Sequence, residues 1–278
     1  MKTRLSSGTT EVIISDKGPT ILVGERINAT GKGKMSQALK TGDMEPIRQE
    51  ALAQIQAGAN ILDVNVGIAG TDELVLLPQA VQAIMDIVDI PLCLDSNNSE
   101  ALEATLKVYP GKPLMNSVTG EEHSLKAILP LVKEYGAAVI GLVIDDDGIP
   151  SDVDRRVDIA GKIVERAEAL GIPREDIVID CLLQSMGVEP GAAVVTFETI
   201  RKVKKKLGVN LTVGASNGSF GLPDRELLNG AFMAMAIAAG VTCAIANVER
   251  VRPIILAADL LMGRDEYARR YIEAYRQR

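Results

Sequence analysis

Short apolar runs recur along the whole chain, and most of them stop at an acidic or amide residue. Leu92-Cys93-Leu94 stops at Asp95, and Ile177-Val178-Ile179 stops at Asp180. Runs this short and this continuously apolar are typical of strands buried on both faces, as in a parallel sheet. The pattern predicts strands near residues 20–25, 60–66, 91–95, 113–118, 138–144, 177–180, 211–215 and 243–247.

Helical segments are predicted in the intervals between these strands. Glu45 to Gly58 ends on a glycine, which favours a helix C-cap, and residues 72–89 begin with acidic side chains that favour a helix N-terminus. Ser99 is the expected N-cap of the next helix. Further helices are expected over 121–135, 152–170, 197–207, 224–239 and from Ile254 to the C-terminus.

Eight alternations of strand and helix predict an α/β fold, a single (β/α)8 TIM barrel in which residues 1–278 form one domain. Two small domains are a weaker option at this length. A doubly wound open sheet is the main alternative, but no G-x-G-x-x-G follows the first strand. Residues 1–19 precede that strand as an N-terminal extension. Within it, residues 10–15 and the turn at 16–19 predict a cap on the barrel floor.

Composition narrows the classes of function. A net charge of −7, an aromatic content of 3% and the absence of Trp argue against nucleic-acid binding. No apolar run reaches the roughly 18 residues of a membrane span, and the N-terminus lacks the apolar segment of a secretion signal. Cys93, Cys181 and Cys243 are odd in number and widely spaced, without zinc-ligand spacing. They predict buried free thiols and a cytoplasmic setting.

Polar side chains at the strand ends are the candidate chemistry. In a barrel of parallel strands, the carboxyl ends meet at one mouth, where active sites of this architecture lie. Asp63 and Asn65 are two residues apart, so they face the same side of their strand. The lining is made of carboxylates and carboxamides without histidine or lysine, which suits a neutral heterocycle rich in hydrogen-bond donors better than a phosphate. The residues expected to converge there are Glu25, Asp63, Asn65, Asp95, Asn116, Asp180 and Asn217.

Five short motifs lie at these strand ends in a defined order. They are Gly24-Glu25-Arg26-Ile27-Asn28, Asp63-Val64-Asn65-Val66-Gly67, Leu94-Asp95-Ser96, Met115-Asn116-Ser117 and Ser216-Asn217-Gly218-Ser219-Phe220. In this order they resemble the pterin-binding methyltransferases, which include the methyltetrahydrofolate:corrinoid protein methyltransferases and the folate domain of cobalamin-dependent methionine synthase. The resemblance runs from about residue 20 to the end. Phe220 replaces a glutamine of one family member and resembles the methionine synthase branch.

The resemblance implies a methyltransferase that moves a methyl group between N5 of tetrahydrofolate and the cobalt of a corrinoid protein, as in one-carbon or demethylation metabolism. Tetrahydrofolate or 5-methyltetrahydrofolate would be its substrate. Positions matching Asp95, Asn116 and Asp180 hold the pterin in the family, where carboxylates can accept its amino and ring N–H groups. The other implied substrate-binding residues are Glu25, Asp63, Asn65, Ser216 and Arg225. For the aspartates, a helix N-cap or a loop-closing role is the alternative.

Asn217 matches the catalytic asparagine of the family. Negative charge builds on N5 as the methyl group departs, and a carboxamide can present either its N–H or its C=O to that atom. A contact that strengthens only in the transition state accelerates the reaction. The structural alternative for Asn217 is a left-handed turn residue before Gly218. For Arg225, the alternative is an exposed arginine at a helix start.

The resemblance also implies a homodimer and a corrinoid carried by a partner protein that docks at the barrel mouth. A D-x-H-x-x-G segment commonly marks a corrinoid carrier, and the surroundings of His123, the single histidine, do not match it. His123 at a helix start predicts a surface or capping role. Asp145, Asp146 and Asp147 could bind a hard cation or form a solvated turn. A dihydropteroate synthase-like condensing enzyme and a non-catalytic folate-binding protein are the alternative functions.

Overall fold

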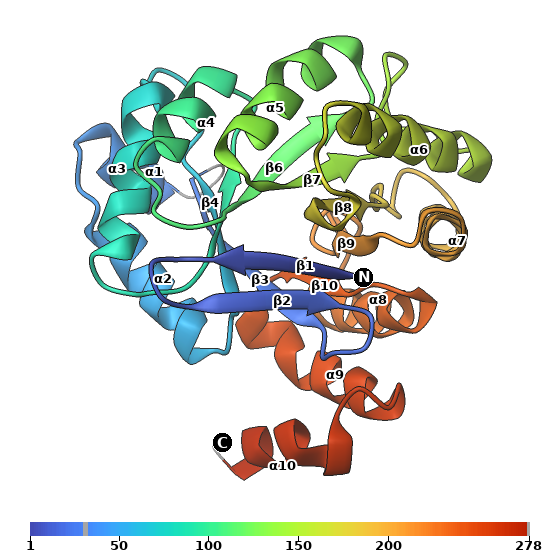
Figure 1. Cartoon of the computed structure of the whole chain (residues 1–278). Coiled ribbons are helices and arrows are strands. Elements are labelled where there is room, and N and C mark those ends of the chain that lie inside the picture. The colour runs from blue at the N-terminus through green and yellow to red at the C-terminus, as the bar shows by residue number, and fades with distance from the viewer. Residues whose placement is uncertain (30–32, 277–278) are drawn as a thin grey trace.

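The computed structural model describes residues 1–29 and 33–276. Parallel strands close into a barrel in the order β10-β3-β4-β5-β6-β7-β8-β9, with helices around it (Figure 1). This architecture confirms the predicted TIM barrel. The barrel strands are β3 (Ile21–Asn28), β4 (Ile61–Asn65), β5 (Leu92–Asp95), β6 (Leu114–Thr119), β7 (Ala138–Leu142), β8 (Ile177–Asp180), β9 (Asn210–Gly214) and β10 (Cys243–Ala246).

The helices follow the predicted order, with one addition before the second barrel strand. Short 3₁₀ turns, η1 (Arg174–Asp176) and η2 (Glu266–Ala268), accompany them. The helix α1 was not predicted, and α7 begins before the predicted Phe197. The helices are α1 (Gly33–Lys40), α2 (Glu45–Gln56), α3 (Glu73–Met85), α4 (Ser99–Leu106), α5 (Glu122–Tyr135), α6 (Val153–Ala169), α7 (Ala192–Leu207), α8 (Arg225–Ala239), α9 (Val248–Leu261) and α10 (Arg269–Arg276).

The N-cap predicted for α4 was wrong by one residue. Asn98, with extended backbone, caps this helix because its Oδ1 accepts hydrogen bonds from the backbone N–H of Glu100 (3.0 Å) and Ala101 (3.3 Å). Ser99 is already the first helical residue. An asparagine caps as well as a serine, so residue type alone could not choose between these neighbours.

The predicted continuous C-terminal helix was also wrong. Helix α9 ends at Leu261, and Gly263 then takes a left-handed conformation with φ of 70°. The carboxylate of Asp265 accepts the backbone N–H of Arg270 (3.1 Å) and Tyr271 (3.0 Å), so it satisfies free donors at the start of α10. The last two residues of the predicted helix lie outside the described residues.

The N-terminal extension is a hairpin across the barrel floor. Its strands, β1 (Lys2–Ser6) and β2 (Glu11–Ser15), are antiparallel and lie across the front of Figure 1. Leu5 and Ile14 are fully buried against inward-facing side chains from the amino ends of the barrel strands. Asn210 Nδ2 donates to Thr3 Oγ1 (2.9 Å) and to the Ile14 carbonyl (3.0 Å). The predicted floor cap is confirmed, although β1 itself was missed because it carries only one large apolar residue.

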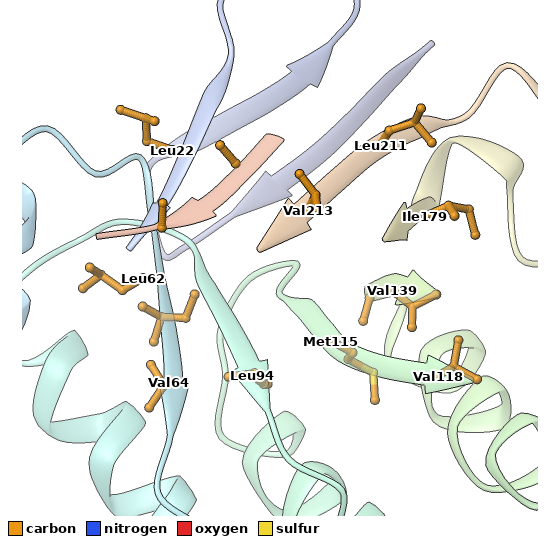
Figure 2. Close-up of a cluster of buried hydrophobic side chains, with 14 of the residues drawn as sticks. Leu22, Leu62, Val64, Leu94, Met115, Val118, Val139, Ile179, Leu211 and Val213 are labelled. Atoms are coloured by element: carbon orange, nitrogen blue, oxygen red, sulfur yellow. The ribbon is translucent and has the colours of Figure 1, made fainter. Parts of the chain in front are cut away.

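Alternation along each strand separates a helix-facing layer from the barrel interior. In β4, Leu62 and Val64 join the apolar layer between strands and helices that Figure 2 shows. Ile61 belongs instead to the interior cluster under the mouth. Because successive side chains point to opposite faces, Asp63 and Asn65 share the interior side with Ile61.

Three smaller predictions concern single residues and membrane spans. All three cysteines are buried free thiols, as predicted. His123 is exposed in the first turn of α5, as predicted. Within residues 1–29 and 33–276, no helix has both the length and the apolar character needed to cross a membrane.

Candidate active site

The carboxyl ends of β4, β5 and β6 bring four of the predicted polar side chains into contact. Asn65 Nδ2 donates to Asp95 Oδ2 (2.9 Å), and Asn116 Nδ2 donates to Asp63 Oδ1 (3.2 Å). Each amide therefore donates a hydrogen bond to a carboxylate on another strand. Asp95 is not a helix N-cap, since Asn98 caps the following helix. Asn65 Oδ1 already accepts the Gly67 N–H (3.0 Å), whereas Asn116 Oδ1 accepts no hydrogen bond from a described residue and is available to a ligand.

Glu25 reaches the mouth through an irregularity in β3. The register of β3 against β4 shifts between Gly24 and Ile27, and the Ser216 hydroxyl donates to Glu25 Oε1 from the loop after β9. Gln54 of α2 supports the shifted segment, because its Oε1 accepts the Arg26 N–H (2.9 Å). A Cβ on Gly24 would lie 2.3 Å from Gln54 Oε1, so this contact requires glycine.

Asp180 ends β8, on the side of the barrel opposite β4. Its Oδ1 accepts the backbone N–H of Leu182 (2.7 Å), so the carboxylate closes a short loop after the strand. It does not cap α7, whose N-cap is Gly191. Within the described residues, Asp180 Oδ2 has no hydrogen-bonding partner, which leaves it free to accept from a ligand in the mouth.

Burial disfavours the ionised form of these carboxyls. Burial raises the pKa of Asp63 to about 8, and the nearby carboxylate of Asp95 adds to that rise. Burial raises the pKa of Asp180 to about 7, while the Leu182 N–H and the Arg156 charge oppose it. The pKa of Asp95 is raised by burial as well, against the hydrogen bond from Asn65. A ligand that donates N–H groups would favour the ionised forms.

Asn217 lies in an exposed turn directly after β9. It is not among the non-glycine residues with positive φ, so the left-handed alternative is wrong. Its carboxamide makes no hydrogen bond to any described residue. The turn is held instead by Arg225, whose Nη2 donates to the Ser216 carbonyl (2.7 Å) and whose Nε donates to Ser219 Oγ (3.1 Å). Arg225 is an exposed first residue of α8, and it fixes the backbone beside Asn217.

The acidic loop at 145–147 lies between β7 and α6. Asp145 Oδ1 accepts the Asp147 N–H (3.0 Å), and Arg155 Nε donates to Asp145 Oδ2 (2.7 Å). Arg155 also contacts the Asp147 carboxylate. One guanidinium therefore pairs with two of the three carboxylates in this turn.

Arg156 and Gln54, which support the site, were not predicted, although their spacing along each helix held a signal. Helix α6 buries Ala160, Ile163 and Ala167, and Arg156 falls in register with them at helical spacing. Gln54 follows Ile47 and Ala51 on the buried face of α2 in the same way. A polar residue in phase with an apolar stripe predicts a buried polar group, which must find partners.

Comparison with known proteins places these features in a family. The family model of pterin binding enzymes matches residues 24–247. Methylcorrinoid:tetrahydrofolate methyltransferase of Eubacterium limosum is 31% identical over 264 residues, which cover 92% of this chain and 96% of that protein. Methionine synthase of Mycobacterium leprae (strain TN) is 30% identical over 263 residues, or 90% of this chain but 22% of that protein.

Solved structures of low sequence identity share the fold. A crystal structure of dihydropteroate synthetase with a product superposes with a TM-score of 0.72 at 15% identity, covering 94% of this chain and 100% of that chain. A Yersinia pestis structure of the enzyme abbreviated DHPS, with a pterine-sulfa conjugate, gives a TM-score of 0.69 at 15% identity, with 94% and 99% covered. At this identity, the likeness concerns the barrel alone.

Proposed function

Because this chain belongs to the pterin-binding enzymes, we propose that it moves a methyl group between N5 of tetrahydrofolate and the cobalt of a corrinoid carried by another protein. The relative that it covers almost from end to end is named for that kind of transfer. The observation that carries the proposal is Asn217, whose unengaged carboxamide stands beside a mouth lined with hydrogen-bond acceptors.

The acceptors of the mouth would hold the pterin. Asp95 and Asp180 can accept its amino and ring N–H groups, and the carbonyl oxygen of Asn116 can accept a further one. Charge-assisted hydrogen bonds of this kind contribute about 1.5–3 kcal/mol each. Asp63 would stay beneath them and fix Asn116 through the bond at 3.2 Å.

Asn217 would act on the charge that changes at N5. In the forward direction, the electron pair of cob(I) forms the bond to the methyl carbon while the N5–carbon bond breaks. The pair left on N5 takes up a proton that reaches it through water. The Asn217 carboxamide can rotate to accept from a protonated N5 or donate to an unprotonated one. Because that contact is strongest as the bond breaks, it would act on the rate more than on binding.

The corrinoid protein would dock over the barrel mouth. Val188, on the loop after β8, and Phe220, on the loop after β9, are exposed by 81% and 71%. The two loops contact each other, since the Met186 N–H donates to the Gly218 carbonyl (2.9 Å). They form an apolar rim beside Asn217, which supports contact with a partner there.

The experiment is to add cob(I)alamin and 5-methyltetrahydrofolate to the purified chain and follow the cobalt absorbance. We expect the methylcobalamin spectrum, and the reverse reaction with tetrahydrofolate and methylcobalamin. Folate binding without methyl transfer in either direction would contradict the proposal and favour a non-catalytic folate-binding protein.

A dihydropteroate synthase-like condensation has less support. Such an enzyme must bind a pyrophosphate, but residues 211–219 contain no Lys or Arg. The nearby Arg225 donates two hydrogen bonds to the turn itself. Condensation of a pterin pyrophosphate by the purified chain would overturn this ranking.

The homodimer and the cytoplasmic location stay predictions. Light scattering of the purified chain would test the first, and fractionation of cells the second.

A further inference from the structure

Arg156 is a charged residue that the barrel buries completely. Its side chain is 0% exposed, and no carboxylate of a described residue lies within ion-pair distance of it. Its guanidinium donates instead to neutral acceptors on two loops of the mouth. Nε donates to the Pro150 carbonyl (2.6 Å), Nη1 to the carbonyls of Cys181 (2.9 Å) and Leu182 (2.8 Å), and Nη2 to Gln184 Oε1 (2.9 Å).

Three of these acceptors belong to the loop that follows Asp180. Leu182 holds a left-handed backbone with φ of 49°, which is unfavourable for a leucine. Arg156 and the Thr196 hydroxyl (2.8 Å) both donate to its carbonyl, and this orientation turns the Leu182 N–H toward Asp180 Oδ1. The guanidinium thus fixes the backbone that holds the carboxylate, and its positive charge favours the ionised form of Asp180.

The same loop supports the turn that carries Asn217. The Met186 N–H donates to the Gly218 carbonyl (2.9 Å). A Cβ on Gly218 would lie 2.0 Å from Leu183 Cδ2, so the loop and the turn are packed without room for a larger residue. A shift of residues 181–186 would therefore move Asn217 as well as Asp180.

We infer that Arg156 is a positioning residue, which holds the pterin-binding carboxylate of Asp180 and the Asn217 turn in one arrangement. The inference rests on the proposed function for what the site binds. The titratable groups around Asp180 are Arg156 from α6, Cys181 on its own loop and Cys243 from β10. Burial raises the pKa of both thiols, so they stay neutral, and Arg156 is the one permanent charge among these three groups.

The test compares Arg156→Gln, Arg156→Lys and two controls. Arg155→Gln changes the neighbouring arginine of the same helix, which faces the acidic loop. Thr196→Val removes a neutral hydrogen bond to the same Leu182 carbonyl. Two readouts are needed: hydrogen exchange of the Leu182 and Met186 amides, and the pH dependence of 5-methyltetrahydrofolate binding measured by calorimetry.

Arg156→Gln is expected to lose protection at both amides. Its folate affinity at pH 7 should fall about tenfold or more, and the pH midpoint of binding should rise by about one unit because Asp180 loses its neighbouring charge. Arg156→Lys should lose protection but keep the midpoint. Thr196→Val should keep the midpoint, and Arg155→Gln should match the wild type in both readouts.

Wild-type protection and midpoint in Arg156→Gln would overturn the inference. Should that variant not fold, wild-type protection in Arg156→Lys would overturn it equally. A wild-type chain that binds no folate at any pH would instead refute the proposed function, and the exchange of the two amides would still decide the role of Arg156.

Discussion

At the residue scale, the polar groups of the mouth differ in burial and in the hydrogen bonds that they already make. Asp180 is buried and Asp95 is half-buried, and the contacts of both acceptors with a pterin would exist before and during the reaction. Asn217 is exposed and makes no hydrogen bond to the described protein, so its contact can follow the charge on N5. This difference separates effects on affinity from effects on rate.

Alanine substitutions should show that separation. Asp95→Ala and Asp180→Ala are expected to weaken folate binding, because each removes a charge-assisted acceptor. Asn217→Ala should lower the rate on the order of 10–1,000-fold while changing affinity less, as for single transition-state donors in other enzymes. Calorimetric Kd values and single-turnover rates measure the two effects. Equal losses of affinity in all three variants, with no separate rate loss at Asn217, would contradict this division.

The ionised carboxylate of Asp180 should also destabilise the ligand-free protein at high pH. Burial raises its pKa from 3.8 to about 7, so the folded state prefers the protonated carboxyl. The associated stability is complete below about pH 4 and is lost as the pH rises through 7. At pH 8, the free energy of unfolding measured in urea should therefore be higher for Asp180→Asn than for the ligand-free wild type, by at most about 4 kcal/mol. At pH 4 the two proteins should have the same free energy of unfolding.

Asp146→Asn serves as the control for that measurement, because it removes an exposed carboxylate from the acidic loop at 145–147. A lower stability of Asp180→Asn at pH 8 would show that the carboxylate is stabilised, and not penalised, by its surroundings.

At the element scale, the strands and their polar ends were predictable because burial on both faces and a polar stop are local properties of the sequence. Asp95 and Asp180 end their strands as predicted. For Arg156 and Gln54, which support the site, helical spacing predicts burial but does not identify the partners. Arg156 lies in a charged stretch, and its partners on the loop after β8 are distant in sequence. Asn98 and not Ser99 caps α4 because of its backbone angles, which both residue types can adopt. The end of α9 likewise depends on the left-handed backbone of Gly263, a conformation that a glycine can adopt but need not adopt.

The floor hairpin is an element whose attachment can be tested. Asp89 accepts hydrogen bonds from the Thr9 N–H (3.4 Å), from Thr10 Oγ1 (3.2 Å) and from the hydroxyls of Ser7 and Thr9. These donors lower its pKa to about 2. Its stabilising effect is present above about pH 4 and lost as the pH falls through 2. Asp89→Ala should speed hydrogen exchange in β1 and β2 at neutral pH.

A control variant and the folate affinity test whether the effect of Asp89→Ala is confined to the hairpin. Asp86→Ala, at the exposed end of α3, should leave the hairpin amides protected. Folate affinity should stay unchanged in Asp89→Ala, since the hairpin covers the end of the barrel opposite the mouth. Unchanged exchange in Asp89→Ala would mean that burial of Leu5 and Ile14 alone holds the hairpin.

At the scale of the whole molecule, exposed aromatic side chains lie at two distant places. Phe220 stands on the rim of the mouth, whereas Tyr275 is 71% exposed on α10. Helix α10 is tied to the amino end of β3, because Arg270 Nη1 donates to Asp259 Oδ2 (3.0 Å) and Asp259 accepts from Thr20. Phe220 on the rim and Tyr275 on α10 are therefore equally exposed aromatic residues at distant sites, so Tyr275 can serve as the control for Phe220.

Charged substitutions at these positions should separate partner docking from chemistry. Phe220→Asp and Val188→Asp are expected to slow methyl transfer with a corrinoid protein by about tenfold or more, because a charge would be desolvated at the contact. Transfer with free cob(I)alamin should change less, and Tyr275→Asp should match the wild type in both assays. Equal slowing with both methyl acceptors would assign the rim to catalysis and not to docking.

Among the described residues, buried side chains fill the barrel interior beneath the mouth and the floor hairpin covers its other end, so we expect ligands to reach the site from the mouth. Folate and the corrinoid carrier would then have to use the same opening, so they cannot come and go independently. Kinetics of methyl transfer should show a compulsory order in which folate enters first and leaves last. A large excess of carrier should trap product folate beneath it as a dead-end complex. The turnover rate would then pass through a maximum and decline as carrier concentration rises, a direct consequence of closing one end of a barrel.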